Sequence, residues 1–211
     1  MMDQLSRLDF SESFQAFRKK SKQISYLVWG AMVLSSCIYV VIVMILVKSR
    51  SDIASQLSPM LANTIGVLSM VIIPIVGYLV STWMRSDDQF RKIMAQSLAT
   101  IALKQKANSG TGSVGNMLNV NSLSRYVDDT SLSDLERQMI KITPRSKATQ
   151  VVRSSIDNTL AVVGLLLFIL GGSNYMPLAI GCMAFSIALN LLFGKPTLDR
   201  DYRRVIDIVN K

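Results

Sequence analysis

The sequence predicts an all-α integral membrane protein with four transmembrane helices in two hairpins, both termini in the cytoplasm, and amphipathic cytoplasmic helices. The first observation behind this fold class is a set of long apolar runs. The second is that Lys and Arg residues gather on the segments between those runs. Of 23 such residues, five lie in 1–25, eleven in 85–153 and five in 195–211. Basic residues concentrate in cytoplasmic segments, so this distribution predicts the orientation of the chain.

The first two predicted spans are uncharged throughout. One covers residues 26–47 and the other covers residues 61–84. Each exceeds the roughly 20 residues that a helix needs to cross the hydrocarbon core. We therefore expect a transmembrane hairpin over residues 26–84.

The last two spans are expected to form a second hairpin over residues 155–194. The fourth covers residues 175–193, and Gly171, Gly172, Ser173 and Asn174 form a tight turn before it. The apolar core of the third is short, so this span must begin near Ser155 to match the fourth. The alternative is a re-entrant hairpin that does not cross the membrane.

The N-terminal segment, residues 1–25, is predicted to form one short amphipathic helix. Its apolar residues are Leu5, Leu8, Phe10, Phe14 and Phe17, and its basic residues are Arg18, Lys19, Lys20 and Lys22. One interpretation places Phe14, Phe17 and the basic cluster against a lipid surface. The other docks this helix on the cytoplasmic part of the protein itself.

Residues 85–154 are predicted to form a cytoplasmic helical region. Its first part has a helical apolar face, formed by Phe90, Ile93, Met94, Ser97, Leu98 and Ile101. This pattern fits either one helix continuing from the second span to about residue 107 or a new helix starting at Ser86-Asp87, since Ser and Asp are good caps.

The rest of this region consists of a polar linker followed by predicted helices. Residues 108–130 are rich in Gly, Ser and Asn and are predicted to be a flexible linker. Ser133 and Glu136 have the spacing of a capping box, which predicts a helix start, and Pro144 is expected to end that helix. A final amphipathic helix is expected within 195–211, with Leu198, Tyr202, Val205, Ile206 and Val209 on one face.

Small residues mark faces of the spans that are suited to close helix packing. Packing rather than water expulsion drives helix association in lipid, so small side chains are favoured at contacts. These faces pack the spans of one chain together or bind other subunits. Their predicted members are Gly66, Gly77, Ser81, Gly164, Cys182 and Ser186.

Asp157 is the one acidic residue near a predicted span core, and such a residue is a functional candidate. Asn158 and Asn190 lie sixteen residues to either side of the turn at Asn174 and therefore at similar depth. The three side chains are predicted to form a polar cluster at the cytoplasmic end of the second hairpin. The simpler interpretation is that Asp157 caps the span and pairs with Arg153.

The composition argues against catalysis and against nucleic-acid binding. The sequence has no His, and its two Cys residues lie mid-span without ligand neighbours. We therefore expect no enzyme activity, cofactor or metal. The net charge of +9 is assigned to orientation and to anionic lipid at the cytoplasmic face.

These features predict a scaffold or adaptor subunit of a multi-protein membrane assembly. The expected setting is a bacterial inner membrane and a secretion, conjugation or transport machine, with other subunits or further copies of the chain as partners. One alternative is a homo-oligomeric ion channel or small transporter using the polar cluster. Another is a lipid-binding or membrane-remodelling protein using the N-terminal helix.

Overall fold

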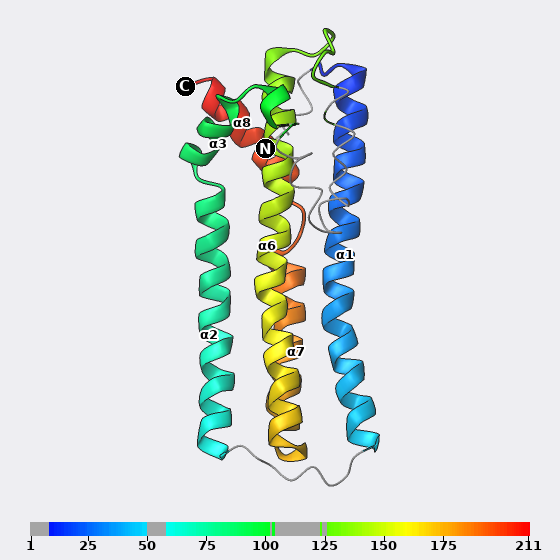
Figure 1. Cartoon of the computed structure of the whole chain (residues 1–211), viewed down its shortest axis with the longest axis vertical. Helices are drawn as coiled ribbons and strands as arrows, with labels where there is room; N and C mark the ends of the chain where they lie inside the picture. The colour runs from blue at the N-terminus through cyan, green and yellow to red at the C-terminus, as the bar shows by residue number, and fades with distance from the viewer. Residues whose placement is uncertain (1–8, 50–57, 102, 104–122, 124–125) are drawn as a thin grey trace. The chain divides into compact units, whose positions relative to one another are not determined.

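The computed structural model describes residues 9–49, 58–101, 103, 123 and 126–211, and every regular element among them is helical (Figure 1). The chain forms two compact units. We call the first, Met1–Ser25, Trp83–Thr149 and Pro196–Lys211, the head unit. We call the second, Tyr26–Thr82 and Gln150–Lys195, the span unit.

Four helices are long and apolar enough to cross a membrane. They are contained in α1 (Glu12–Ser49), α2 (Pro59–Met84), α6 (Asp134–Gly171) and α7 (Met176–Phe193). These helices define an integral, multi-pass membrane protein, as the apolar runs predicted.

Within the span unit, α6 and α7 are joined by a short turn and run antiparallel. The 3-10 helix η4 (Ser173–Tyr175) follows Gly172, whose φ of 72° is readily adopted only by glycine. Gly164 lies against the backbone of Ala179, where an added Cβ would come within 2.6 Å of the carbonyl oxygen. A larger residue would therefore force these two helices apart.

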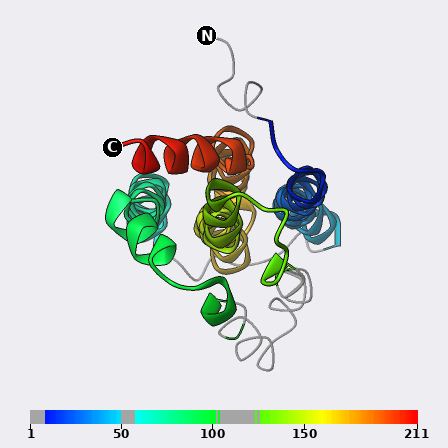
Figure 2. The ribbon, with the colours of Figure 1, turned by 90° about the horizontal axis from the view of Figure 1, so that it is seen from above.

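The other two helices of the span unit lie on opposite sides of α6, as both views show (Figures 1 and 2). Val43 of α1 packs in a cluster with Phe168 and Met183, whereas Ala62 of α2 packs in another with Leu160 and Cys182. The two helices of the expected first hairpin, residues 26–84, are thus separated by α6 rather than packed on each other.

Helix α1 corrects the prediction of a separate N-terminal helix. It runs from Glu12 to Ser49 without interruption, because no proline or strong stop signal lies between the amphipathic segment and the apolar run. Leu5 and Leu8 lie outside the described residues. Phe14 and Phe17 are buried in the head unit.

The segment after α2 breaks at the cap position and does not continue as one helix. Ser86 has an extended ψ of 151° before α3 (Asp87–Met94), and the helical hydrogen bonding stops again near Ala95. Residues 98–101 and 103 are helical. Phe90, Leu98 and Ile101 nonetheless share the head-unit core, so the apolar face was predicted correctly although the helix is not continuous.

Helix α6 begins where the capping box predicted but does not end at Pro144. Ser133 N donates to Glu136 Oε2 (2.6 Å), and Glu136 N donates back to Ser133 Oγ (3.3 Å). Ile140 and Ile142 are fully buried just before the proline. Their packing offsets the single hydrogen bond that proline removes, so the helix continues to Gly171.

The head unit has a core of its own. Phe14 and Phe17 meet Tyr202, Val205 and Ile206 of α8 (Leu198–Val209) in one cluster, together with Met139 and Ile140 of α6. Most of the linker predicted at 108–130, including its GTGSVG sequence, lies outside the described residues. Of its end, Tyr126 packs against Phe17 with ring centroids 5.1 Å apart.

Candidate functional site

Asn158 and Asn190 are in direct contact in the span unit. Asn190 Nδ2 donates to Asn158 Oδ1 at 2.8 Å and to Ser186 O at 3.1 Å. The first of these bonds joins α6 to α7. Asn190 is fully buried and Asn158 is half-buried, so the bond between them lies at the packed face of the two helices.

Helix α1 completes this cluster through two serines that the sequence did not single out as partners. Ser36 Oγ donates to Asn158 Oδ1 at 2.6 Å. Asn158 Nδ2 donates to Ser35 Oγ at 2.8 Å and to the Met32 carbonyl at 3.2 Å. One asparagine therefore connects three helices. We call Ser35, Ser36, Asn158, Ser186 and Asn190 the asparagine cluster.

Trp29 adds a further bond between α1 and α7. Its indole Nε1 donates to the Asn190 carbonyl at 2.9 Å. Ser186 Oγ lies 3.3 Å from Ser36 Oγ and donates to the Asp157 carbonyl at 2.8 Å. The small side chain of Ser186, predicted as a packing residue, thus also satisfies a backbone group between α6 and α7.

The carboxylate of Asp157 points to an arginine and not to the two asparagines. Arg153 Nε lies 3.0 Å from Asp157 Oδ2, one helical turn before it. Both residues are buried, at 6% and 0% exposure. The expected three-residue cluster is therefore divided: Asn158 and Asn190 meet, while Asp157 forms the ion pair of the simpler interpretation.

Arg153 also contacts α2 and α7. Its Nη1 donates to the Pro74 carbonyl at 3.4 Å, and its guanidinium carbon lies 5.5 Å from the Phe193 ring centroid. Gly77 leaves space for it, since a Cβ there would lie 3.0 Å from Nη1. The predicted small position in α2 therefore accommodates a charged side chain from α6.

The remaining predicted packing residues also face neighbours within the chain. A Cβ at Gly66 would meet the Leu178 side chain at 2.8 Å. Cys182 is buried beside Leu160 in the α2-facing cluster. Ser81 is buried, and its hydroxyl donates to the Tyr78 carbonyl one turn earlier at 2.9 Å.

The residues of the N-terminal segment that were predicted to contact lipid differ in how deeply they are buried. Phe14 and Phe17 are 0% and 4% exposed, so the prediction that they contact lipid is wrong; the head-unit core buries them. Arg18 and Lys22 both pair with Asp199 of α8. Lys19 and Lys20 are exposed.

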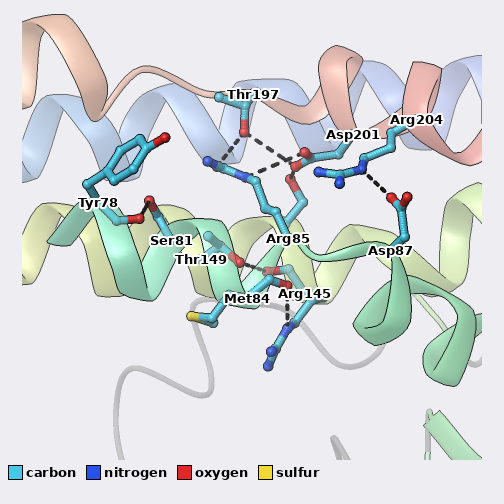
Figure 3. Close-up of polar contacts among 11 residues, drawn as sticks. Tyr78, Ser81, Met84, Arg85, Asp87, Arg145, Thr149, Thr197, Asp201 and Arg204 are labelled. Atoms are coloured by element: carbon cyan, nitrogen blue, oxygen red, sulfur yellow. Dashed lines mark hydrogen bonds and ion pairs between the residues drawn. The ribbon is translucent and has the colours of Figure 1, made fainter. Parts of the chain in front are cut away.

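A buried polar network in the head unit was missed by sequence reasoning (Figure 3). Asp201 of α8, 1% exposed, accepts a hydrogen bond from Ser146 and lies 3.5 Å from Arg85 Nε. Arg85 Nη2 donates to Thr197 Oγ1 at 2.6 Å. The only sequence signal was Asp201 occurring on the otherwise apolar face of a short amphipathic helix.

One ion pair and one capping carboxylate hold other parts of the head unit together. Arg204 Nε lies 2.7 Å from Asp87 Oδ1, which joins α8 to α3 (Figure 3). Glu136 also accepts a hydrogen bond from Ser11 N at 2.6 Å. The capping carboxylate of α6 therefore fixes the start of α1 as well as its own helix.

Burial and hydrogen bonding move the pKa values of head-unit groups in opposite directions. Burial raises the pKa of Asp201 even though the Arg85 guanidinium lowers it. For Glu136, burial acts upward, but hydrogen bonds from Ser133 and Ser11 outweigh it and hold the pKa below its ordinary value. Burial lowers the pKa of Lys147 to about 8.

The described side chains form no group of three or more potential metal ligands from His, Cys, Asp and Glu. The polar contacts of both units are hydrogen bonds and ion pairs that connect helices. Comparisons with known protein families, with curated proteins and with solved structures found no match. The fold and these contacts therefore define the class, a multi-pass helical membrane protein.

Proposed function

We propose that this protein is a non-enzymatic scaffold or adaptor subunit of a multi-protein membrane assembly. In this proposal the span unit is the membrane anchor, and the head unit is the docking platform in the cytoplasm. The setting we propose is a bacterial inner membrane, in a machine for secretion, conjugation or transport. Its partners are other subunits of that machine.

The observation that carries the proposal is the apolar packing of the span unit beyond the asparagine cluster. From residue 160 to the turn, and from the turn to residue 185, the buried side chains of α6 and α7 are apolar or cysteine. Leu160, Phe168 and Met183 are almost fully buried there. A conducting path needs a polar lining or a hydrated lumen, so this packing favours an anchor.

Surface exposure supports a role in assembly. Only 11% of the most apolar 18-residue stretch of α1 is buried within the chain, and the same holds for the helix that contains α2. The corresponding share for α6 is 44%. Large side chains such as Leu34, Val71 and Leu79 are more than half exposed. In a membrane these faces meet lipid or the helices of other subunits, and four spans leave ample surface for both.

The head unit supports the same role. It has its own apolar core, and its helices are connected by the Asp201 network and the Asp199 ion pairs. A unit held together in this way presents a defined surface to a partner. A peripheral segment that folded only on lipid would not need this core.

The test is purification of the tagged chain from native membranes in a gentle detergent, with native mass and co-purifying proteins identified. A large particle containing several different proteins is the expected result, and untagged membranes provide the control. A particle that contains only copies of this chain would refute the adaptor role.

A homo-oligomeric channel or small transporter is the second candidate. It is favoured by Asp157 Oδ1 and Asn190 Oδ1, which are buried and accept no hydrogen bond within the described part of the chain. Asp157→Asn should then abolish ion flux in liposomes that contain the purified protein. If the unaltered protein conducts no ions, or if the substitution leaves the flux unchanged, the channel function is refuted.

A further inference from the structure

Arg145 of α6 has no carboxylate partner within the described part of the chain. Its Nε donates a hydrogen bond, at 3.3 Å, to the carbonyl of Met84, the last residue of α2. Its guanidinium carbon lies 5.7 Å from the ring centroid of Trp83. These two contacts hold the guanidinium at the end of α2, and neither of them neutralises its charge.

The two terminal nitrogens of this guanidinium are open. Neither Nη atom of Arg145 donates a hydrogen bond to a described residue, and neither is among the buried polar atoms that lack a partner. The side chain points away from the Asp201 network of the same unit (Figure 3). Both Nη groups can therefore donate to a ligand, in the planar arrangement that matches phosphate.

The end of α2 places this arginine at a membrane surface. The helix that contains α2 is long and apolar enough to cross a membrane, and Trp83 lies in the last turn of α2. The Trp83 side chain is 62% exposed. It continues a row of exposed apolar side chains at helical spacing, namely Ile72, Val76 and Leu79. Tryptophan favours this level, where its ring meets hydrocarbon and its N–H meets the headgroups.

We propose that Arg145 and Trp83 bind the headgroup of an anionic phospholipid. The Nη groups donate to the phosphate oxygens, which an arginine engages with two parallel hydrogen bonds. The Trp83 ring and the exposed face of α2 lie along the acyl chains. Because no described carboxylate compensates Arg145, a lipid with a net negative charge complements the site better than a zwitterionic lipid. This site does not depend on the adaptor role, since it requires only that α2 spans a membrane.

The test measures lipid contact at Trp83 in the full chain. Trp29→Phe leaves Trp83 as the only tryptophan, and the purified chain is placed in phosphatidylcholine bilayers at constant ionic strength. Bromine atoms on the acyl chains of a lipid quench the fluorescence of a tryptophan that they contact. Brominated phosphatidylglycerol, which is anionic, is compared with brominated phosphatidylcholine at equal mole fractions. We expect phosphatidylglycerol to quench Trp83 at the lower mole fraction.

Substitutions of Arg145 test its part in this preference. Arg145→Gln removes the charge and should reduce the preference for phosphatidylglycerol about fivefold, the contribution of one arginine near an anionic surface. Arg145→Lys keeps the charge but lacks the planar fork, so it should retain only part of the preference. Lys20→Gln is the matched control, because it removes one exposed cation from α1 and should leave the preference at Trp83 unchanged.

Equal quenching of Trp83 by the two brominated lipids would overturn the proposal, as would an unchanged preference in Arg145→Gln. If Arg145→Gln does not fold, a chain with Trp83→Phe decides instead, since Trp29 of α1 is then the only reporter. A preference confined to Trp83 supports the site. A preference that is equally strong at Trp29 would reflect general attraction of anionic lipid to a basic chain and would also overturn the proposal.

Discussion

Replacing Asn158 by Leu should weaken the packing of α1 against the α6–α7 pair. Leucine has a side chain of similar length but can make none of the polar bonds that Asn158 makes. Those bonds reach Ser36, Ser35 and the Met32 carbonyl on α1 and Asn190 on α7. Ser35 keeps its own bond to the Met32 carbonyl at 2.9 Å, so the loss falls mainly on contacts between helices.

The size of the effect follows from those four contacts. Hydrogen bonds between helices in membranes contribute on average about 0.6 kcal/mol each. The substitution should therefore lower the free energy of unfolding by about 2–3 kcal/mol. Thr159→Ala is the matched control, because Thr159 is exposed and bonds only within its own helix, to the Ser155 carbonyl.

The assay is reversible unfolding in mixed micelles with increasing denaturing detergent, followed by helical circular dichroism and, with Trp83 replaced by Phe in both chains, by Trp29 fluorescence. Trp29 is suited to this because its indole bonds to Asn190 O across the same contact. We expect the variant to lose the Trp29 signal before the helical signal. A loss below about 0.5 kcal/mol, close to one average bond, would show that the asparagine cluster does not hold these helices together.

Other substitutions test single features of the two units. Asp201→Ala should lower head-unit stability by about 1–3 kcal/mol because it removes the buried acceptor of the Ser146 hydrogen bond and the carboxylate that faces Arg85, while Asp207→Ala, at an exposed position, should not; equal thermal shifts would contradict this. Gly164→Ala should cost about 1–3 kcal/mol through backbone displacement, whereas Gly181→Ala, whose Cβ would meet only one methionine carbon at 3.5 Å, should be tolerated; detergent unfolding measures both. The pKa of Glu136 is held below its ordinary value of 4.5, so its ionised form should stabilise the head unit above that pH and lose this effect as the pH falls. In Glu136→Gln, the free energy of unfolding should therefore fall less steeply as the pH is lowered. An unchanged pH dependence would refute the stabilising role of the Glu136 carboxylate.

Local features of the fold were predictable because they depend on neighbouring residues. The apolar runs are long enough for helices, the Gly171-Gly172 turn reverses the chain, and Ser133 with Glu136 caps α6. The contact between Asn158 and Asn190 was also predictable, since a tight turn relates residues at equal distance from it. Each of these needs only helical geometry and chain connectivity.

Other features were missed because they depend on residues far apart in the chain. Pro144 should have ended α6, but burial of Ile140 and Ile142 keeps the helix continuous. Phe14 and Phe17 fit a lipid surface equally well by pattern, and only the head-unit core shows that they are buried. An amphipathic pattern identifies the apolar face of a helix but not what covers it.

The sequence by itself determined the class of protein, because apolar length and uninterrupted helical propensity are properties of a single segment. It also determined which residues could approach each other across the turn before α7. Only the tertiary structure decided that Asp157 pairs with Arg153, that Ser35 and Ser36 reach Asn158, and that α6 separates α1 from α2. Those outcomes depend on which helix faces pack together, and that choice is made by the summed packing of all four helices rather than by any one of them.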